Sequence, residues 1–294
     1  MRSRTVSSNS NKVNSPAWID HNGALLSADS GILKAANRGF HYGDGLFETL
    51  LVRNGRIRLR DAHFDRLFAG ISQLRYVIPI HFTRENLEVS ILQLCEQNGH
   101  IPLARVRLTI YRGDGGLYDP EDLHPRYLIE SWALGPADIE QNEKGLTVDI
   151  YPDGIKSCDR LANIKSNNFL IYALAALYAK EYGLDDCLVG NSHGRLADST
   201  IANLFYCKDG KVYTPPLSEG CVAGVMRRFL LSTLPDAGFP VHERPVTAED
   251  LLDADEVFLS NAIRGIRWVQ TFRKSRYARD LSQAIHHQLI KALR

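Results

Sequence analysis

The first half of the chain alternates apolar and polar positions in several short runs, and this pattern predicts β-strands. In "ARVRLTIYR", Val106, Leu108 and Ile110 alternate with polar residues, as in a strand with one buried face. The run "LFETLLVRNGRIRL" predicts a hairpin whose two-residue turn is Asn54-Gly55. "AWIDHNGALL" predicts two further strands around a turn, and "RYLIESWAL" predicts another strand.

Apolar spacings of three and four residues predict helices between these strands. The segment "DAHFDRLFAGISQLRYV" places five apolar residues on one helical face: Phe64, Leu67, Phe68, Ile71 and Leu74. A second amphipathic helix is expected over about 84–98, because Thr83 and Glu85 stand at its start and Gly99 marks its end.

The second half of the chain mixes both patterns. Strands are predicted in "LTVDIYP", "DDCLVGN", "ANLFYCKDGKVYTPP" and "DEVFLSN", and helices over 168–182, 224–235, 247–253 and 278–293. We therefore expect an α+β protein of two domains, each a mixed sheet with flanking helices. The polar run "GPADIEQNEKG" lacks apolar periodicity and is the candidate linker. The expected divisions are a disordered segment 1–16, a small domain 17–133, a linker 134–143 and a larger domain 144–294.

Composition narrows the range of partners and locations. The 294 residues carry a net charge of +1, so we expect no general attraction to nucleic acid or to an anionic membrane. The apolar runs are too short to span a bilayer, and no signal peptide is visible. The five cysteines are scattered, odd in number and without CxxC spacing. We therefore expect no disulfide framework, no metal site and a cytoplasmic location.

Lys165 is the first candidate for chemistry. It stands in a short polar turn before a long apolar helical pattern, next to Ser166, Asn167 and Asn168. A lysine whose pKa is lowered by burial at a domain junction can form a Schiff base with an aldehyde. Taken alone, a lysine at a helix start is more often a solvated surface residue, so other residues must support this interpretation.

Four further features could support a site for an anionic aromatic ligand. Gly224 opens a helical pattern, and the free N–H groups of Val225 and Met226 could bind a phosphate. Arg66, on the polar side of a helix, could donate two hydrogen bonds to the same phosphate. Asp198, predicted in a polar turn, could hold a ring nitrogen protonated. The glycine-rich "RGFHYGDG" matches no phosphate loop; it predicts tight turns beside two aromatic residues that could wall a pocket, Phe40 and Tyr42.

Taken together, these motifs resemble the fold type IV pyridoxal-phosphate enzymes, also called the class IV aminotransferase family. The matching segments are "RGFHYGDGLFETLLVRNGRIRLRDAHFDRL", "LANIKSNNFL", "LADSTIANLFYCKDGKVYTPP", "GCVAGVMRRFLL" and "ADEVFLSNAIRGI". The resemblance runs from about Trp18 to the last helix. It implies the two-domain fold of the D-amino-acid aminotransferases, with mixed sheets and flanking helices.

The resemblance also implies roles for individual residues. Lys165 would carry pyridoxal 5'-phosphate as a Schiff base and move the proton at the substrate Cα. The residues implied to bind the cofactor are Arg66, Lys165, Asp198, Asn203, Val225, Met226, Asn261 and Ala262. Asp198 departs from the family's usual glutamate and is one methylene shorter. Met226 replaces a common threonine, so only its backbone could contact the phosphate.

Within the family, the motifs favour 4-amino-4-deoxychorismate lyase, which eliminates pyruvate to leave 4-aminobenzoate for folate synthesis. The runs "LSNA", "LANIKSNN", "GVMRRF" and "RGDGG" carry this preference. An aminotransferase acting on branched-chain or D-amino acids is the alternative, although Leu117 stands where D-amino-acid enzymes have a carboxylate-binding arginine. Candidates to position the substrate are Phe40, Tyr42, Thr49, Arg112 and Tyr118.

Two further expectations concern assembly and activity. Family members are homodimers in which the small domain of one subunit shapes the other's pocket, so the resemblance implies a homodimer here. A non-catalytic relative that binds an anionic ligand or a partner is the remaining hypothesis. The presence of Lys165 counts against it, because a protein that only binds has no need of the amine.

Overall fold

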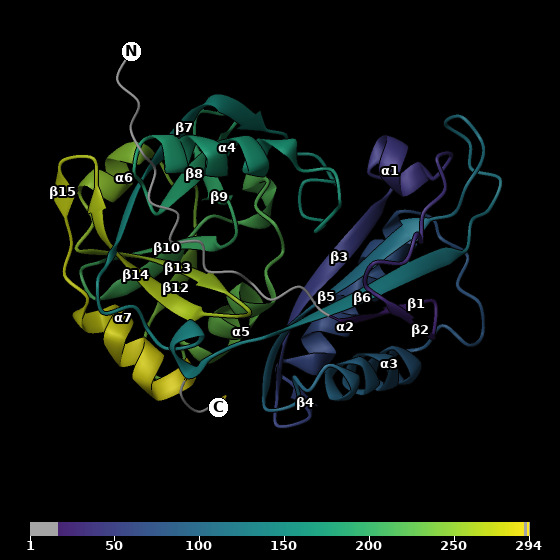
Figure 1. Ribbon diagram of the computed structural model, residues 1–294. Coiled ribbons are helices and arrows are strands. Elements are labelled where there is room, and N and C mark those ends of the chain that lie inside the picture. The colour runs from purple at the N-terminus through teal and green to yellow at the C-terminus, as the bar shows by residue number, and fades with distance from the viewer. Residues whose placement is uncertain (1–16, 291–292, 294) are drawn as a thin grey trace, which may run out of the picture.

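The computed structural model describes residues 17–290 and 293, which form two β-sheets with helices packed against them (Figure 1). The predicted disordered segment 1–16 lies outside the described residues. Each sheet draws its strands from one half of the chain, as the predicted division requires. The domain boundaries and the linker 134–143, which contains the short 3₁₀-helix Pro136–Asp138, stay a prediction.

The first sheet is antiparallel and has the strand order β2-β1-β6-β5-β3-β4. Its strands are β1 (Trp18–His21), β2 (Ala24–Ser27), β3 (Gly45–Arg53), β4 (Arg56–Ile57), β5 (Leu103–Arg112) and β6 (Pro125–Ala133). The predicted hairpin is confirmed as β3–β4. Asn54 and Gly55 both have positive φ, of 49° and 69°, as a two-residue hairpin turn requires.

Two helices, α2 (Arg60–Gln73) and α3 (Arg84–Gln97), cover one face of this sheet. Phe64, Leu67 and Ile71 of α2 are fully buried, which confirms the predicted apolar face. Thr83 caps α3 by accepting a hydrogen bond from the N–H of Asn86 at 3.2 Å. The other face of the sheet is turned away from this core, and on it lie the alternate residues of β5.

The second sheet is mixed and has nine strands, in the order β12-β11-β10-β13-β14-β7-β8-β9 with β15 beside β14. Its strands are β7 (Leu146–Lys156), β8 (Asp186–Asn191), β9 (Leu196–Ser199), β10 (Asn203–Lys208), β11 (Lys211–Thr214), β12 (Val241–Glu243), β13 (Glu256–Asn261), β14 (Gly265–Phe272) and β15 (Ser275–Arg276). The β14–β7, β7–β8 and β11–β12 pairs are parallel. Both faces of β10 are buried, since Leu204 and Phe205 contribute to different cores.

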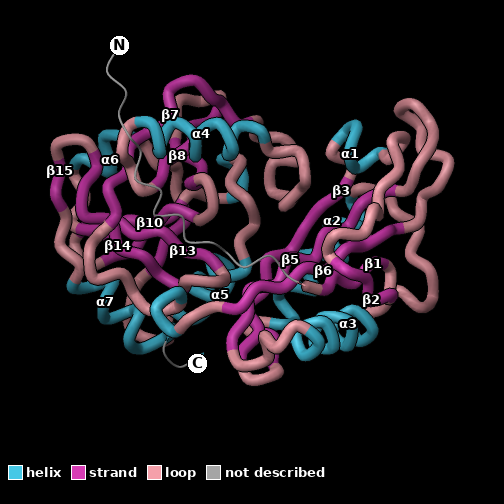
Figure 2. The backbone as a smooth tube through the Cα atoms, in the orientation of Figure 1, coloured by secondary structure: helices cyan, strands magenta, loops and turns pink. Residues whose placement is uncertain are grey.

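Helices cover both faces of this second sheet (Figure 2). They are α4 (Leu170–Glu181), α5 (Val225–Thr233), α6 (Ala248–Leu252) and α7 (Asp280–Ile285), which continues as a π-turn over His286–Ile290, with a 3₁₀-turn at Leu217–Glu219. Helix α4 packs against β7 and β8, whereas α5 and α7 pack against β13. Along the described part of the chain, no helix combines the length and the apolar character needed to cross a bilayer.

Three local expectations were wrong or incomplete. Asp198 lies in strand β9, not in a polar turn, and all four residues of that strand are buried. The glycine-rich segment forms a short helix, α1 (Arg38–Tyr42), capped by Asn37 and ended by Gly43 at φ 62°. Strands β9, β12, β14 and β15 were not predicted, because short or two-sidedly buried strands show little alternation.

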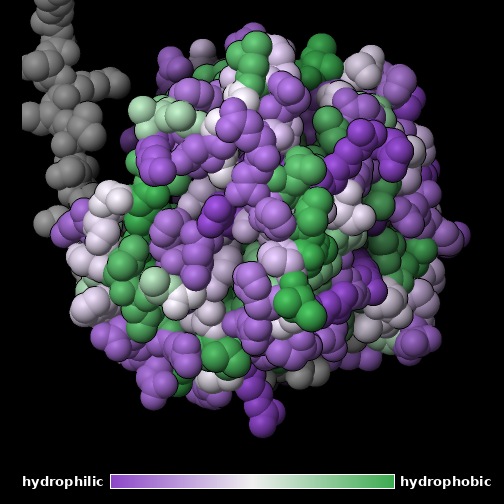
Figure 3. All heavy atoms as spheres, turned by 90° about the vertical axis from the view of Figure 1, so that its right-hand side faces the viewer, coloured by the Kyte–Doolittle hydropathy of each residue, from purple (hydrophilic) through white to green (hydrophobic). Residues whose placement is uncertain are grey.

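On the outer face of the first half of the chain, hydrophobic atoms lie in separate patches among hydrophilic ones (Figure 3). Exposed apolar side chains in this half include Val77, Ile78, Ile80 and Leu117. Isolated exposed apolar residues are normal on protein surfaces, so this face does not indicate a contiguous docking surface.

The segment that contains Lys165 joins the two halves by pairing with β3. The N–H of Phe47 donates to the Lys165 carbonyl, and the N–H of Asn167 donates to the Gly45 carbonyl, each at 2.9 Å. Strand β4 pairs only with the far end of β3, at Val52 and Arg53, so the edge near Gly45 is free for this pairing. The lysine main chain is thereby fixed against the first sheet.

We expect Gly45→Ala to destabilise the protein by about 1–3 kcal/mol, the usual cost of overpacking. An added Cβ would clash with the carbonyl of Ile110 and lie 2.6 Å from Nδ2 of Asn167. Urea unfolding measures the change. Gly31→Ala is the matched control, since nothing lies within 4 Å of its Cβ, and it should change stability by less than about 0.5 kcal/mol. Equal stabilities of the two variants would contradict the close approach.

Candidate active site

A cavity of about 1400 Å³ is lined by residues of both sheets and of the loops that follow their strands. Most of the sequence-predicted site residues line it: Phe40, Tyr42, Thr49, Arg66, Lys165, Asp198, Asn203, Val225, Met226, Asn261 and Ala262. These residues come from distant parts of the chain. Their convergence in one cavity is a result of the tertiary structure.

Lys165 is partly buried in the cavity wall, and its Nζ lies 4.4 Å from the centre of the Phe47 ring. Burial is the main cause that lowers the pKa of this amine to about 8; the positive charges of Arg66 and Arg107 act in the same direction, and Glu48 and Asp198 oppose them. At neutral pH, Lys165 therefore has far more neutral, nucleophilic amine than an ordinary lysine.

Arg66 reaches the cavity from α2 and is held by a buried carboxylate. Its Nε donates to Glu48 at 2.7 Å and its Nη2 to the other carboxylate oxygen at 2.5 Å. His63 Nδ1 lies 2.6 Å from Glu48. Burial alone would raise the pKa of Glu48, but Arg66 and His63 together hold it at about 2. The remaining Nη1 donates to the carbonyl of Ala223 at 3.0 Å, so the guanidinium lies beside the start of α5.

The start of α5 is fixed next to Arg66. Asn203 donates to the carbonyl of Val222 at 2.9 Å, and a Cβ on Gly224 would clash with the Asn203 side chain. The N–H groups of Val225 and Met226 are the first two of the helix and have no carbonyl partner four residues earlier within it. Together with Arg66 they provide a place for an anion.

Asn261 and Ala262 lie at the end of β13 on the same cavity. The Asn261 side chain accepts hydrogen bonds from the N–H groups of Ile263 and Arg264, at 3.1 and 2.8 Å. Arg58 donates to the carbonyls of Ala262 and Ile263, the latter at 3.1 Å. This turn therefore has a fixed shape where it borders the cavity.

Asp198 is buried and lines the same cavity. It accepts hydrogen bonds from the Tyr172 hydroxyl at 2.8 and 2.9 Å and from the N–H of Val222 at 2.9 Å. Lys156 lies 3.2 Å from one of its oxygens. Burial raises the pKa of Tyr172 well above its usual value, and the neighbouring Asp198 raises it further, so Tyr172 remains a neutral donor.

Two predicted substrate residues do not line the cavity. Arg112 is buried elsewhere: it donates to Asp44 at 3.0 Å and to the carbonyl of Leu74 at 2.7 Å, and it covers the Tyr76 ring. Tyr118 is 81% exposed, and its ring lies against that of Tyr42, which lines the cavity. Neither Arg112 nor Tyr118 is among the lining residues, so their roles in positioning substrate stay a prediction.

Sequence reasoning missed the basic wall of the cavity. Arg105 and Arg107 alternate with the buried Val106 on β5, and with Arg264 they line the cavity. Their positions alternate with apolar ones, a pattern that does not distinguish a side facing solvent from a side facing a cavity. The only signal in the sequence was that this polar side carries two arginines. Glu48, Lys156 and Tyr172 were missed because each acts through a partner far away in the chain.

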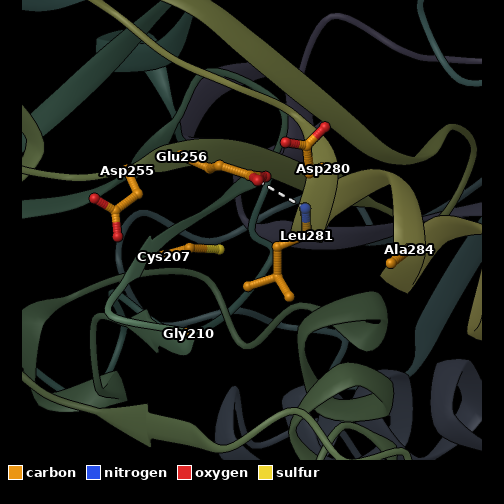
Figure 4. Close-up of a pocket in the computed structure, with 7 residues that line it drawn as sticks. All are labelled: Cys207, Gly210, Asp255, Glu256, Asp280, Leu281 and Ala284. Atoms are coloured by element: carbon orange, nitrogen blue, oxygen red, sulfur yellow. Dashed lines mark hydrogen bonds between the residues drawn. The ribbon is translucent and has the colours of Figure 1, made fainter.

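A smaller cavity of about 370 Å³ lies near α7 and is lined partly by the carboxylates of Asp255, Glu256 and Asp280 (Figure 4). Glu256 accepts from the N–H groups of Leu281 and Ser282 and so caps α7. Within the described residues, no group of three or more potential ligands could hold a metal ion. The carboxylate of Glu256 in this smaller cavity is therefore explained by its role in capping α7. The smaller cavity has no arrangement of reactive residues like that of the large cavity among its lining residues.

Solved structures share this fold. The branched-chain aminotransferase of the archaeon Thermoproteus uzoniensis superposes with a TM-score of 0.84 over 95% of each chain, at 22% sequence identity. The predicted fold class is confirmed: this is an α+β protein with the architecture of the fold type IV aminotransferases.

Sequence comparisons define the family. The chain is 32% identical to the aminodeoxychorismate lyase of Vibrio harveyi over 232 residues, which cover 78% of this chain and 83% of that protein. It is 26% identical to a D-alanine aminotransferase of Listeria monocytogenes over 257 residues, 82% of each chain. Residues 45–272 match the family described as amino-transferase class IV, and the chain belongs to that family.

Labelling of Lys165 by an amine-reactive reagent should rise with pH around a midpoint near 8 in the ligand-free protein. Below that pH the amine is protonated and does not react. Peptide mass spectrometry after short exposures at each pH gives the curve, with the exposed Lys211 as the reference amine. A Lys165 curve that coincides with the Lys211 curve would show that the cavity does not perturb this amine.

Proposed function

We propose that the chain is a pyridoxal-phosphate enzyme that eliminates pyruvate from 4-amino-4-deoxychorismate and leaves 4-aminobenzoate, a step of folate synthesis. The observation that carries the proposal is the position of Lys165: one amine of lowered pKa lies in a cavity that also has an anion site and a buried carboxylate. Similarity to a relative named as that lyase supports the choice of reaction.

The residues of the cavity fit pyridoxal phosphate. Arg66 and the N–H groups of Val225 and Met226 would hold the phosphate, because a guanidinium and a helix start both favour a dianion. Met226 contributes through its backbone, since its side chain is buried and has no hydroxyl. Asp198 would face the ring nitrogen. Tyr172 and the Val222 N–H hold that carboxylate, so the shorter side chain has a fixed position.

The cofactor supplies an electrophilic carbon and a ring that accepts electrons. Lys165 would hold the cofactor covalently and would serve as the base that takes the proton from the substrate Cα. The lowered pKa suits both tasks, because the neutral amine is the base and the nucleophile. The phosphate site and Asp198 keep the ring in place while Lys165 moves the proton.

The basic wall favours a substrate with two carboxylates, as 4-amino-4-deoxychorismate has. Arg105, Arg107 and Arg264 line the cavity, whereas a branched-chain substrate would present an apolar side chain to such a wall. Glu130, beside Arg107, offsets part of this charge, and its own pKa is raised by burial. An aminotransferase acting on branched-chain or D-amino acids is the alternative, since removal of the Cα proton is common to both reactions.

We also propose a homodimer in the cytoplasm. Helix α4 presents Leu170, Leu174 and Leu177 to solvent, with exposed fractions of 74%, 50% and 63%. These residues follow helical spacing, and Leu170 with the exposed Ile201 borders the cavity. A second copy seated on this stripe would bury it and close the cavity mouth.

The protein supplied with pyridoxal phosphate and 4-amino-4-deoxychorismate should yield pyruvate and 4-aminobenzoate in equal amounts. Lys165→Ala should lower turnover by about 10²–10⁴-fold, because it lacks the base, whereas Lys211→Ala should match the wild type. A parallel assay supplies leucine or D-alanine with 2-oxoglutarate. Glutamate in that assay without 4-aminobenzoate in the first would favour the aminotransferase, and activity that persists in Lys165→Ala would reject Lys165 as the base.

In solution, the protein should have twice the 33.0 kDa mass of one chain. Leu174→Glu should shift it toward the monomer, because a charge on the apolar stripe would be desolvated in the interface. Ile80→Glu, at a 97% exposed residue of the first half, is the control and should leave the mass unchanged. Analytical ultracentrifugation measures both. A Leu174→Glu protein that remains dimeric would place the interface elsewhere.

A further inference from the structure

Lys156 and Asp198 form an ion pair from which water is almost excluded. The two side chains are 2% and 3% exposed, and their charged atoms lie 3.2 Å apart. Lys156 stands at the end of β7 and Asp198 in β9, on either side of β8. Asp198 lines the large cavity, whereas Lys156 is not among its lining residues. The carboxylate therefore borders the cavity, and the ammonium does not.

Among the residues that the structure describes, Asp198 is the carboxylate paired with Lys156. Its Nζ donates to the Tyr172 hydroxyl and lies 4.9 Å from the centre of that ring and 5.4 Å from the Phe169 ring. The Cys221 thiol is close, with a pKa that burial raises to about 12, so it is uncharged near neutral pH. Asp198 and Lys165 also interact electrostatically across the cavity wall. Lys156 is the cation in direct contact with Asp198.

We propose that Lys156 is a positioning residue that holds the Asp198 carboxylate beside the cavity and makes a proton on the cofactor's ring nitrogen less favourable. The inference rests on the proposed contact between Asp198 and that nitrogen. A carboxylate alone attracts a proton to the ring. A carboxylate already paired with an ammonium attracts it less, because the like charge of Lys156 acts on the same site.

This arrangement sets how strongly the ring withdraws electrons. A ring nitrogen that is protonated part of the time stabilises negative charge at the substrate Cα less than a fully protonated one. Tyr172 fixes the position of the Asp198 side chain, which is shorter than the family's usual glutamate. Lys156 offsets part of the negative charge of that carboxylate. The expected consequence is a ring whose protonation responds to the charge at residue 156.

Nuclear magnetic resonance of the enzyme loaded with pyridoxal phosphate carrying ¹⁵N in its ring reports that protonation directly. We expect the pH midpoint of the ring-nitrogen shift to rise by about one unit in Lys156→Gln, which removes the charge but keeps a donor for Asp198. Lys156→Arg retains the charge and should restore the wild-type midpoint. Tyr172→Phe removes a hydrogen bond without changing charge, so its midpoint should move much less than that of Lys156→Gln.

The Asp198→Asn variant tests the contact between Asp198 and the ring separately from the role of Lys156. A midpoint unchanged in Asp198→Asn would reject the contact between Asp198 and the ring, which belongs to the proposed function. A lower midpoint in Asp198→Asn, with Lys156→Gln like the wild type, would overturn the role of Lys156 alone. Lys156→Met serves as a second uncharged variant. If neither uncharged variant binds the cofactor, the proposal is also overturned, because it requires a site that forms without the ammonium.

Discussion

The pairing of the Lys165 segment with the free edge of β3 is the interaction on which the site depends. Two hydrogen bonds of 2.9 Å attach a segment of the second half of the chain to the first sheet. They place the amine over Phe47, within the fields of Arg66 and Arg107, and away from bulk water. Gly45 permits this approach because a side chain there would meet the backbone of the neighbouring strand. An ordinary lysine thereby becomes a reactive one.

Charge in the cavity is organised as two neutral pairs and a surplus of cations. Glu48 balances Arg66, and Lys156 balances Asp198, each with its carboxylate buried. Lys165, Arg105, Arg107 and Arg264 are left to face the cavity. Buried charges are tolerated where they are paired and hydrogen-bonded, so the pairs fix the walls, while the other cations, offset in part by Glu130 beside Arg107, favour anionic ligands. A phosphate-bearing cofactor and a dicarboxylate substrate both suit this distribution.

Local patterns predicted the elements whose burial is one-sided. The β3–β4 hairpin and the helices α2 and α3 follow from Asn54-Gly55, from the apolar face of Phe64, Leu67 and Ile71, and from the Thr83 cap. Strand β9 was missed because its short run "LADS" is buried on both sides and contains polar residues, so nothing alternates. On β5 the alternation was identified correctly, but nothing in the pattern shows that its polar side borders a cavity. Periodicity distinguishes two faces; it does not distinguish water from a cavity.

The sequence by itself determined the fold class and, through the resemblance of its motifs, the lysine and a set of candidate site residues, most of which line the large cavity. The fold class and these residues could be predicted because short sequence motifs and their order along the chain can be read from the sequence directly. Only the tertiary structure decided which charged residues face the cavity and which are used elsewhere. Arg112 is paired with Asp44, whereas Arg107, five positions earlier on the same strand, lines the cavity. Lys156 meets Asp198 across 42 positions of sequence. Such partners depend on strand order and on which face each residue occupies, and neither is encoded in the local sequence around them.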